Sequence, residues 1–405
     1  MQIVDLHSHS RYSRATSGSM NISEITRYAK MKGLNVLGTG DFTHPVWLKE
    51  LKEKLSDIGG IYDHDGIKFI PSTEISLIYK HDGKGRRVHH IILAPDFSVV
   101  DQINEWLDKK GRRDYDGRPI FGFSSVELVD EMMKISKDIE IIAAHAWTPW
   151  YGIFGSMSGF DSLEECFQEK TKHINSIETG LSSDPEMNWR LSSLDKITLV
   201  SNSDAHSPYP WRLGREANVF GFEEASYKNI VNAIRTRKDF LYTIEVDPNY
   251  GKYHFDGHRT CNFSCGPKEA KKLKDMCPKC GKRLITGVLN RVEQLADREP
   301  GFIPNGSVPF KSLIPLSELI SAVTGTDVFT KKVWEVYNRL IDRFGNEFNI
   351  LLNIDKNDLE KTVDEKLAEL IIKNREGKLV IEPGYDGVYG KLVMKEETGL
   401  RKFIK

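Results

Sequence analysis

Two histidines near the start of the chain, His7 and His9, have a spacing that suits a metal site. They follow Ile3 and Val4, whose apolar, β-branched side chains predict a short buried strand. Alternate residues of a strand point to the same face, so we expect both imidazoles on one side. Each neutral imidazole offers a metal one lone pair in a fixed direction. The alternative is a pair of histidines that only caps a core strand, and this motif alone leaves both interpretations open.

Further histidines and carboxylates occur at or near the ends of the apolar runs that follow. Imidazole and carboxylate ligands together suit transition metals rather than Ca²⁺. The set is too large for one ion, so we expect two or three divalent ions (Zn, Mn, Fe or Mg), with Glu74 as the bridging carboxylate. A regular strand cannot direct both His89 and His90 inward, and the neighbouring valine favours His89. The candidate ligands are His7, His9, Asp41, Glu74, His89, His90, His145, Asp204 and His206.

Clustered metal ions would favour one kind of reaction, the hydrolysis of a phosphoester by a metal-activated hydroxide. Such ions lower the pKa of bound water and clamp the attacking and leaving oxygens. We assign catalytic roles to Glu74, Asp204 and His206. Arg14, in the loop after His9, is a candidate to bind the scissile phosphate. The alternative for Arg14 is an ordinary solvent-exposed arginine.

The elements that must position these residues are alternating strands and helices over residues 1 to about 245. This alternation predicts an α/β barrel or a doubly wound sheet. Candidate ligands follow the carboxyl ends of the runs, where barrel enzymes gather their active-site residues. The apolar runs are 2–4, 36–38, 67–70, 88–94, 139–144, 174–177 and 197–200, and the amphipathic segments are 21–32, 45–56, 124–136, 163–172 and 226–237.

Four of the five cysteines lie close together, at Cys261, Cys265, Cys277 and Cys280. Two pairs with short internal spacing are typical of a structural zinc site, and four thiolates would leave no open position for catalysis. Free cysteines in a loop are the alternative. His258 has no partner pattern, and we interpret it as a surface or structural residue.

Two further groups of residues are candidates for contact with DNA. Lysines surround the cysteines, although the net charge of the whole chain is only -1. The family resemblance described below implies a DNA substrate, and the aromatic residues that follow His145 could then hold a base taken out of the helical stack. A solvated lysine surface and a loop packed on the barrel are the alternatives. The candidates are Lys268, Lys271, Lys272, Lys274, Trp147, Trp150, Tyr151, Phe154 and Arg212.

The chain is expected to have three parts: a metallophosphoesterase barrel at 1–245, a zinc-binding module at 250–290 and a mainly helical DNA-binding region at 291–405. The last part contains helical patterns at 317–323, 330–344 and 357–374. Residues 400–404 faintly resemble a sliding-clamp binding peptide. No stretch is apolar enough to span a membrane and no signal-peptide pattern occurs, so we expect a cytoplasmic protein.

The ordered motifs of the first 245 residues resemble those of the polymerase-and-histidinol-phosphatase (PHP) family. The resemblance implies a distorted (β/α)7 barrel with a two- or three-metal phosphoesterase site. One motif departs from the pattern, because many relatives have Thr-Asp-His where this chain has Thr39-Gly40-Asp41. The motifs are Asp5-Leu6-His7-Ser8-His9, Thr39-Gly40-Asp41, Ser72-Thr73-Glu74, Ala144-His145-Ala146 and Ser203-Asp204-Ala205-His206.

Together with the cysteine module and the segment 382–391, these motifs resemble the endonuclease Q family along essentially the whole chain. This resemblance implies a DNA-repair endonuclease that cuts 5′ of deaminated bases (uracil, hypoxanthine, xanthine) or abasic sites. Two other functions remain open at this point. One is a small-molecule phosphomonoesterase of the PHP family, and the other is a catalytically inactive PHP binding module.

Overall fold

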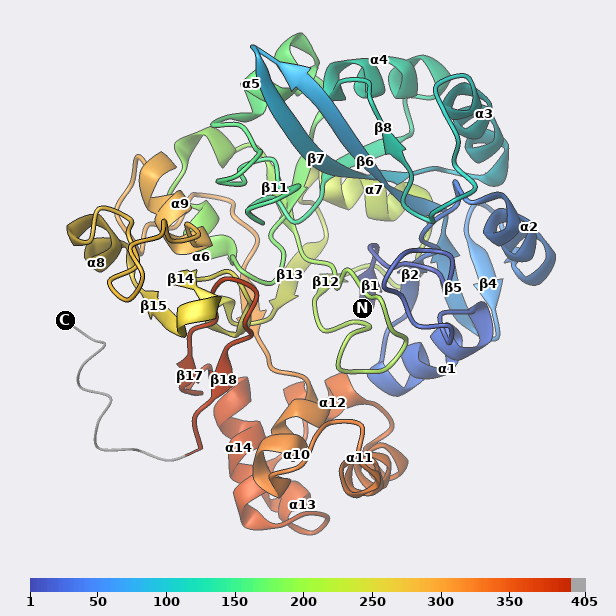
Figure 1. Ribbon diagram of the computed structural model, residues 1–405. Helices are drawn as coiled ribbons and strands as arrows, with labels where there is room; N and C mark the ends of the chain where they lie inside the picture. The colour runs from blue at the N-terminus through green and yellow to red at the C-terminus, as the bar shows by residue number, and fades with distance from the viewer. Residues whose placement is uncertain (395–405) are drawn as a thin grey trace.

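The computed structural model describes residues 1–394, and two β-sheets form the frame of the first 245 residues (Figure 1). The larger sheet has the order β16-β13-β12-β1-β2-β5-β4-β3, and the smaller one has the order β11-β10-β9-β7-β6-β8. The larger sheet contains β1 (Gln2–Asp5), β2 (Val36–Gly38), β3 (Ser56–Asp57), β4 (Tyr62–His64), β5 (Ile67–Ile70), β12 (Ala217–Phe220), β13 (Phe240–Glu245) and β16 (Phe310–Ser312). The smaller sheet contains β6 (Ser72–His81), β7 (Lys84–Leu93), β8 (Ile120–Phe121), β9 (Glu140–Ala143), β10 (Ser176–Glu178) and β11 (Thr198–Val200).

The predicted α/β class is confirmed, and every apolar run predicted as a strand overlaps an observed strand. β6 was missed as a strand, although it carries Glu74. The two sheets meet beside the first motif, where a bridge joins Ser8 to Ala205. Since the strands divide between two sheets, the expected barrel of seven strands stays a prediction.

Helices pack around these sheets with their apolar faces inward (Figure 1). Their starts follow the expected capping chemistry, since the side chains of Asn21, Asp96, Ser124 and Ser226 each accept a bond from a backbone N–H of the first turn. Among residues 1–394 no helix is long and apolar enough to cross a membrane. The helices are α1 (Ile22–Lys32), α2 (Pro45–Lys54), α3 (Phe97–Asp108), α4 (Ser125–Ile135), α5 (Leu163–Phe167), α6 (Pro185–Asn188) and α7 (Tyr227–Thr236).

The cysteine segment and the C-terminal helices follow β13. The first comprises β14 (Asp256–His258), β15 (Phe263–Cys265), α8 (Pro267–Lys272) and α9 (Val288–Leu295). The second comprises α10 (Leu316–Thr324), α11 (Lys331–Phe344), α12 (Glu347–Leu352), α13 (Lys356–Glu360) and α14 (Glu365–Arg375). The segment 357–374 forms two helices instead of the single one predicted, because Asp364 caps a new helix by accepting from Leu367 N.

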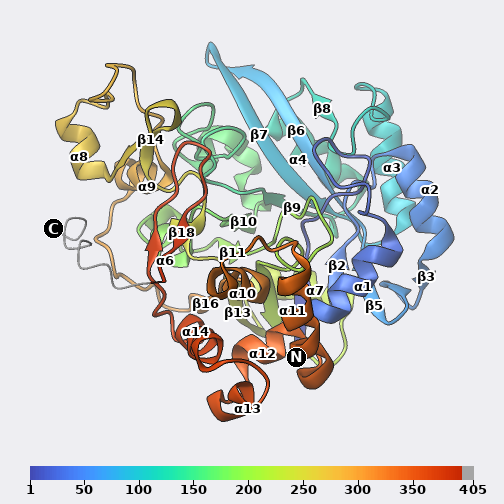
Figure 2. The same ribbon diagram turned by 60° about the horizontal axis from the view of Figure 1, so that its bottom comes forward.

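Two sets of contacts fasten this C-terminal part to the rest of the molecule. Lys32 of α1 lies 2.7 Å from Glu347 of α12, and both side chains are buried. The hairpin of β17 (Ile381–Glu382) and β18 (Lys391–Leu392) then returns toward the cysteine segment (Figure 2), where Tyr385 forms a bridge with Phe255. The predicted boundaries at 245 and 290 stay predictions, but β16, beyond both, pairs with β13 of the larger sheet.

Candidate active site

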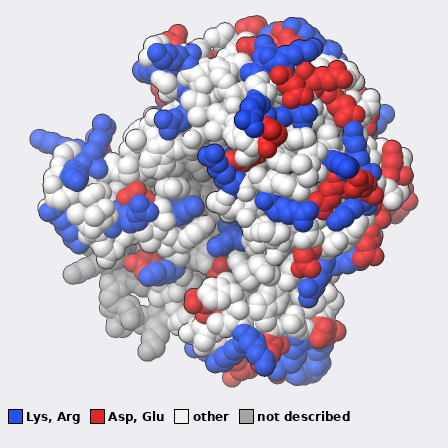
Figure 3. Space-filling model, turned by 45° about the vertical axis from the view of Figure 1, so that its right-hand side comes forward, with Lys and Arg blue, Asp and Glu red and all other residues white. Residues whose placement is uncertain are grey.

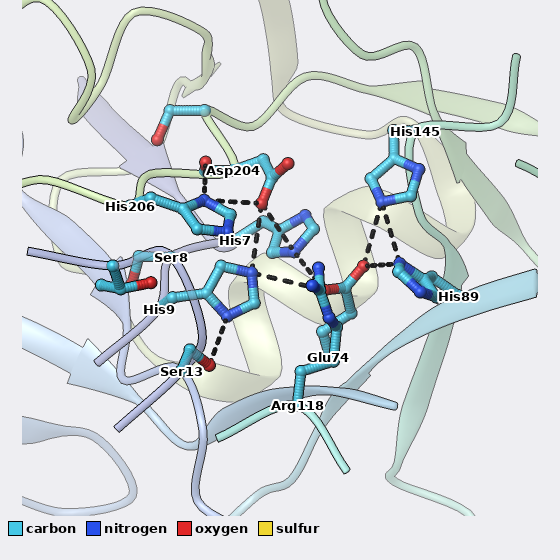
Figure 4. Close-up of polar contacts among 12 residues, drawn as sticks. His7, Ser8, His9, Ser13, Glu74, His89, Arg118, His145, Asp204 and His206 are labelled. Carbon is cyan, nitrogen blue, oxygen red and sulfur yellow. Dashed lines mark hydrogen bonds and ion pairs between the residues drawn. The ribbon is translucent and has the colours of Figure 1, made fainter. Parts of the chain in front are cut away.

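The buried carboxylate of Glu74 lies between two groups of imidazoles (Figure 4). Its Oε1 is 2.7 Å from His89 Nδ1 and 3.0 Å from His145 Nε2. Its Oε2 is 3.3 Å from His9 Nε2 and 3.7 Å from His7 Nε2. Two groups of potential ligand atoms therefore share Glu74, and within each group all atoms lie within 4.8 Å of one another. The groups are His7, His9, Glu74 and Asp204, and Glu74, His89 and His145.

These residues fit divalent metal ions. His7 Nε2 is buried and has no hydrogen-bond partner within the described part of the chain, although it points at the carboxylates of the group. A buried polar atom is normally satisfied, so an unpaired imidazole nitrogen in such a place indicates a missing ligand. The donors are imidazole nitrogens and carboxylate oxygens, which suit divalent transition metals.

Two further carboxylates orient the imidazoles. Both oxygens of Glu178 lie 3.1 Å from His7 Nδ1, and Asp41 Oδ1 lies 3.0 Å from His9 Nδ1. A carboxylate at Nδ1 places the proton there and leaves Nε2 free for a metal. The expectation that Asp41 is itself a ligand is therefore corrected, because its other oxygen accepts bonds from Ser10 and Ser13.

Glu178 was not predicted from the sequence. Glu178 directly follows the apolar run 174–177, as other candidate ligands directly follow their runs. The rule that ligands lie at the carboxyl ends of strands could therefore have found it. It also accepts a bond from His145 N at 2.7 Å, which links the two groups of ligands. Asp41, His145 and Asp204 all adopt a positive φ, a conformation that costs free energy and is concentrated at functional sites.

The charges of the site hold its carboxylates in the ionised form. Burial alone would raise the pKa of Glu74, but His89, Arg118 and His7 hold it well below its usual range. Burial alone would lower the pKa of His7, but Glu178, Asp204 and Glu74 raise it well above the ordinary value. The carboxylate of Glu74 therefore stays ionised, as a ligand of a cation must be.

Two predicted histidine ligands have other surroundings. His90 points away from Glu74, and its Nε2 lies 2.8 Å from Ser125 Oγ. Its inclusion as a ligand is corrected, because successive residues of β7 face opposite sides and His89 takes the inner one. His206 packs beside His9, with ring centroids 4.4 Å apart, but lies outside both ligand groups.

The expected position of the phosphate-binding arginine also changes. The side chain of Arg14 is 74% exposed and pairs with Asp116. Arg118 instead reaches the centre of the site, where its Nη1 lies 3.0 Å from Glu74 Oε2 (Figure 4). No motif or spacing singles out Arg118, which lies in the irregular segment before β8.

The aromatic residues after His145 divide into two pairs. Trp147 and Phe154 are buried against each other, and Trp147 donates to Asn188. Their predicted contact with DNA is therefore corrected to a packing role. Trp150 and Tyr151 are only half-buried, and Tyr151 packs over the ring of His89.

A cavity of about 340 Å³ adjoins the ligands His145 and Asp204. Its walls come from distant parts of the chain, including Arg212 after the last motif and Tyr389 of the C-terminal hairpin. The guanidinium of Arg212 lies 5.6 Å from the centroid of the Tyr389 ring, and Lys252 Nζ lies 5.4 Å from it. Figure 3 shows a hollow on one face of the molecule, with Lys and Arg side chains near its rim.

A separate group of ligands lies in the cysteine segment. His258, Cys261, Cys277 and Cys280 come together within 4.8 Å, and Cys265 is not among them. Cys265 is buried in a small apolar cluster with Ala270 and Leu284, and burial raises the pKa of its thiol to about 12. The same cluster contains Cys277, and Cys261 packs against it, so the four-cysteine site stays a prediction. The distances favour three cysteines with His258, another common zinc set.

The neighbouring lysines are exposed, and their contact with DNA stays a prediction. They are Lys268, Lys271, Lys272 and Lys274.

The chain thus combines an α/β fold with buried ligand groups for divalent ions, as a metal-dependent enzyme does. Over 98% of its length it superimposes on 96% of the lesion-specific endonuclease PfuEndoQ from Pyrococcus furiosus, with a TM-score of 0.88 and 34% identity. The chain also superimposes on a structure of endonuclease Q with a 27-mer duplex carrying an abasic lesion at the active site. The TM-score is 0.89 and the sequence identity 34%, over 100% of this chain and 99% of that one. The chain belongs to the endonuclease Q family.

One family model and two sequence relatives also match the chain. Residues 315–378 match the model of the MJ0043 C-terminal domain. The uncharacterized protein MJ0043 of Methanocaldococcus jannaschii is 36% identical over 73% of this chain, which spans 37% of that protein's length. The uncharacterized protein YqxK of Bacillus subtilis is 29% identical over 91% of both chains.

The placement of His258, and not Cys265, beside the other three cysteines gives a first prediction. His258→Ala and the reference variant Cys277→Ser should each lower the zinc content of the purified protein, because each removes one of four ligands. Cys265→Ala should keep the zinc content of the unmodified chain. Zinc per chain, measured by atomic absorption, checks this. Loss of zinc from the Cys265 variant, together with retention of zinc by the His258 variant, would show that the site uses the four cysteines instead.

Proposed function

We propose that this protein is a DNA-repair endonuclease that hydrolyses the phosphodiester 5′ of a deaminated base or an abasic site. The observation that carries the proposal is the shared carboxylate of Glu74 with a cavity beside it. The cavity volume of about 340 Å³ lies within the range of small-ligand pockets and suits one extruded nucleotide. The full-length similarity to an endonuclease Q that holds an abasic duplex supports the same reaction.

Two residue groups would hold the metal ions. His7, His9 and Asp204 with Glu74 would hold one ion, and His89 and His145 with Glu74 would hold a second. When bound, such ions supply a water of lowered pKa and offset the charge of the phosphodiester. Glu178 and Asp41 keep His7 and His9 oriented for them. Two or three ions of Zn, Mn, Fe or Mg would occupy the site, with His206 beside the first group.

Arg118 is placed to bind the scissile phosphate. The guanidinium of Arg118 reaches Glu74 from the segment before β8, and the Arg118 side chain is one-quarter exposed. A guanidinium offers two parallel donors to phosphate oxygens, and a donor aimed at developing charge stabilises the transition state. Arg118 therefore takes the role that the sequence assigned to Arg14.

The cavity would accept the nucleotide taken out of the stack. An enzyme that inspects a base must extrude it and hold it among side chains. Tyr253 and Tyr389 line the cavity and can contact the base or sugar. Arg212 and Lys252 lie on the same wall, where they can bind flanking phosphates.

The remaining partners are supported less directly. The exposed lysines of the cysteine segment would contact the DNA backbone some distance from the cleaved bond. The proposed clamp-binding peptide at 400–404 lies outside the described residues.

A lesion panel tests the proposed function. Purified protein with Mn²⁺ should nick end-labelled duplexes that carry uracil, hypoxanthine, xanthine or an abasic site, and leave the undamaged duplex intact. Asp204→Asn should lower the rate of cleavage about 10²-fold or more, because it removes the negative charge of one proposed metal ligand. The matched control Asp101→Asn alters an exposed carboxylate of α3 and should keep the rate. Hydrolysis of phosphomonoesters without DNA cleavage would support the small-molecule enzyme instead, and no hydrolysis would support the binding module.

The role of Arg118 gives a separate prediction. Arg118→Gln should lower kcat on an abasic duplex by about 10²-fold, the cost of removing one donor to developing charge. Arg14→Gln should change kcat little, because the Arg14 side chain is exposed and paired with Asp116. Single-turnover kinetics at saturating enzyme separate the two variants. Equal losses of kcat would contradict the assignment.

A further inference from the structure

The hairpin formed by β6 and β7 extends outward from the proposed metal site (Figure 1). Alternate residues of a strand point to one face, and residues directly opposite each other in an antiparallel pair share that face. Glu74 of β6 and His89 of β7 point into the site. Ile78 and Lys80 therefore share the face of Glu74, and Arg87, which pairs with Ile78, shares the face of His89.

This face of the hairpin is open beyond the ligands, whereas the opposite face is packed. Ile75 and Leu77, on the opposite face, are fully buried in the core. Ile78 is 37% exposed, and Ile120 of β8, which pairs with Ser76 on the same face, is 41% exposed. Apolar side chains left open next to a site for a large substrate indicate a surface that the substrate covers.

The cations on the open face are available for a ligand. Lys80 and Arg87 are exposed, and within residues 1–394 neither forms an ion pair. Arg86 points to the other face, where it bonds to the Gly159 carbonyl oxygen and its guanidinium lies 4.2 Å from the centroid of the Phe160 ring. Residues 78–87 contain four Lys or Arg and one Asp. This charge suits a polyanion such as DNA better than it suits an acidic or neutral partner.

The cavity and the open face lie on different sides of the ligands. His145 and Asp204 line the cavity with residues from outside β6, β7 and β8, whereas the open face continues from Glu74 and His89. The proposed cut lies 5′ of the extruded nucleotide. With that nucleotide in the cavity and the scissile phosphate at Arg118, the strand on the 5′ side continues away from the cavity, toward β8 and the hairpin.

We propose that the hairpin face, made of Ile78, Lys80, Arg87 and Ile120, binds the damaged DNA strand on the 5′ side of the cut. Lys80 and Arg87 bind its phosphates. Ile78 and Ile120 pack against its deoxyribose groups. This inference rests on the proposed function, because it assigns the path of the substrate of the same site.

The length of the hairpin gives the positions of these contacts on the DNA. A strand advances about 3.3 Å per residue, so Ile78 and Arg87 lie about 13 Å from Glu74 and Lys80 lies about 20 Å from it. One strand of duplex DNA advances about 3.4 Å per nucleotide. The hairpin face therefore reaches about the fourth to sixth phosphates on the 5′ side of the cut.

A double variant tests the contribution of the two cations. Single-turnover cleavage of an abasic duplex with Mn²⁺, followed over a range of enzyme concentrations, gives the half-saturating concentration. Lys80→Gln with Arg87→Gln should raise this concentration about tenfold and reduce its logarithmic dependence on salt by about two, because two phosphate contacts are lost. The control is Lys228→Gln with Lys238→Gln, which removes two exposed lysines at α7 and should change neither quantity.

Modified substrates test the position and direction of the contact. Uncharged methylphosphonates replace the fourth to sixth phosphates on the 5′ side of the cut, or the matching phosphates on the 3′ side. The 5′ replacement should raise the half-saturating concentration of the unmodified protein about tenfold and should add little for the double variant. The 3′ replacement should affect both proteins equally.

The proposal is overturned if the 5′ replacement affects both proteins equally, or if the double variant loses its sensitivity to the 3′ replacement instead. It also falls if the unmodified protein is insensitive to the 5′ replacement, a result that does not depend on whether a variant folds. Failure of the unmodified protein to cut the unmodified abasic duplex would overturn the proposed function itself.

Discussion

The site depends on one shared carboxylate. Glu74 is buried between His7 and His9 on one side and His89 and His145 on the other, and each of its oxygens serves one pair. An ionised carboxylate in this position is stable only with positive charge or metal ions around it. Glu178 and Asp41 hold the imidazoles from behind, so the geometry around Glu74 is fixed before any ligand arrives.

The cavity beside Glu74 is assembled from segments that are far apart in the sequence. The carboxyl end of β10 and the segment between β11 and β12 line it together with Tyr389 of the C-terminal hairpin. The buried pair of Lys32 and Glu347 holds the C-terminal helices against α1. The C-terminal region therefore belongs to the site, because Tyr389 completes the lining of the cavity.

The sequence predicted the types of chemical groups better than their directions. Residue type and strand ends were enough to single out every member of both groups, and the neighbouring valine favoured His89 over His90. Spacing could not show that Asp41 faces the back of His9, or that Trp147 and Phe154 turn into the core. In the cysteine segment, spacing suggested Cys265 where the fold brings His258 close to the other three cysteines. Such choices depend on packing between strands and loops.

Arg118 carries no local signal at all, and Tyr389 lies in the segment 382–391, which the sequence singled out for the family resemblance but not for a place in the site. Each becomes a site residue only through contacts with segments more than 40 residues away in the chain. Glu178 is different, because it ends a predicted strand and could have been found by the rule that found the other ligands.

The most direct test of this account is to locate the metal ions around Glu74. Anomalous diffraction from crystals grown with Mn²⁺ should show two ions about 3.5–4 Å apart, as in other two-metal sites, each contacting one oxygen of the Glu74 carboxylate. A single ion, or ions that bind without contacting Glu74, would contradict the central claim.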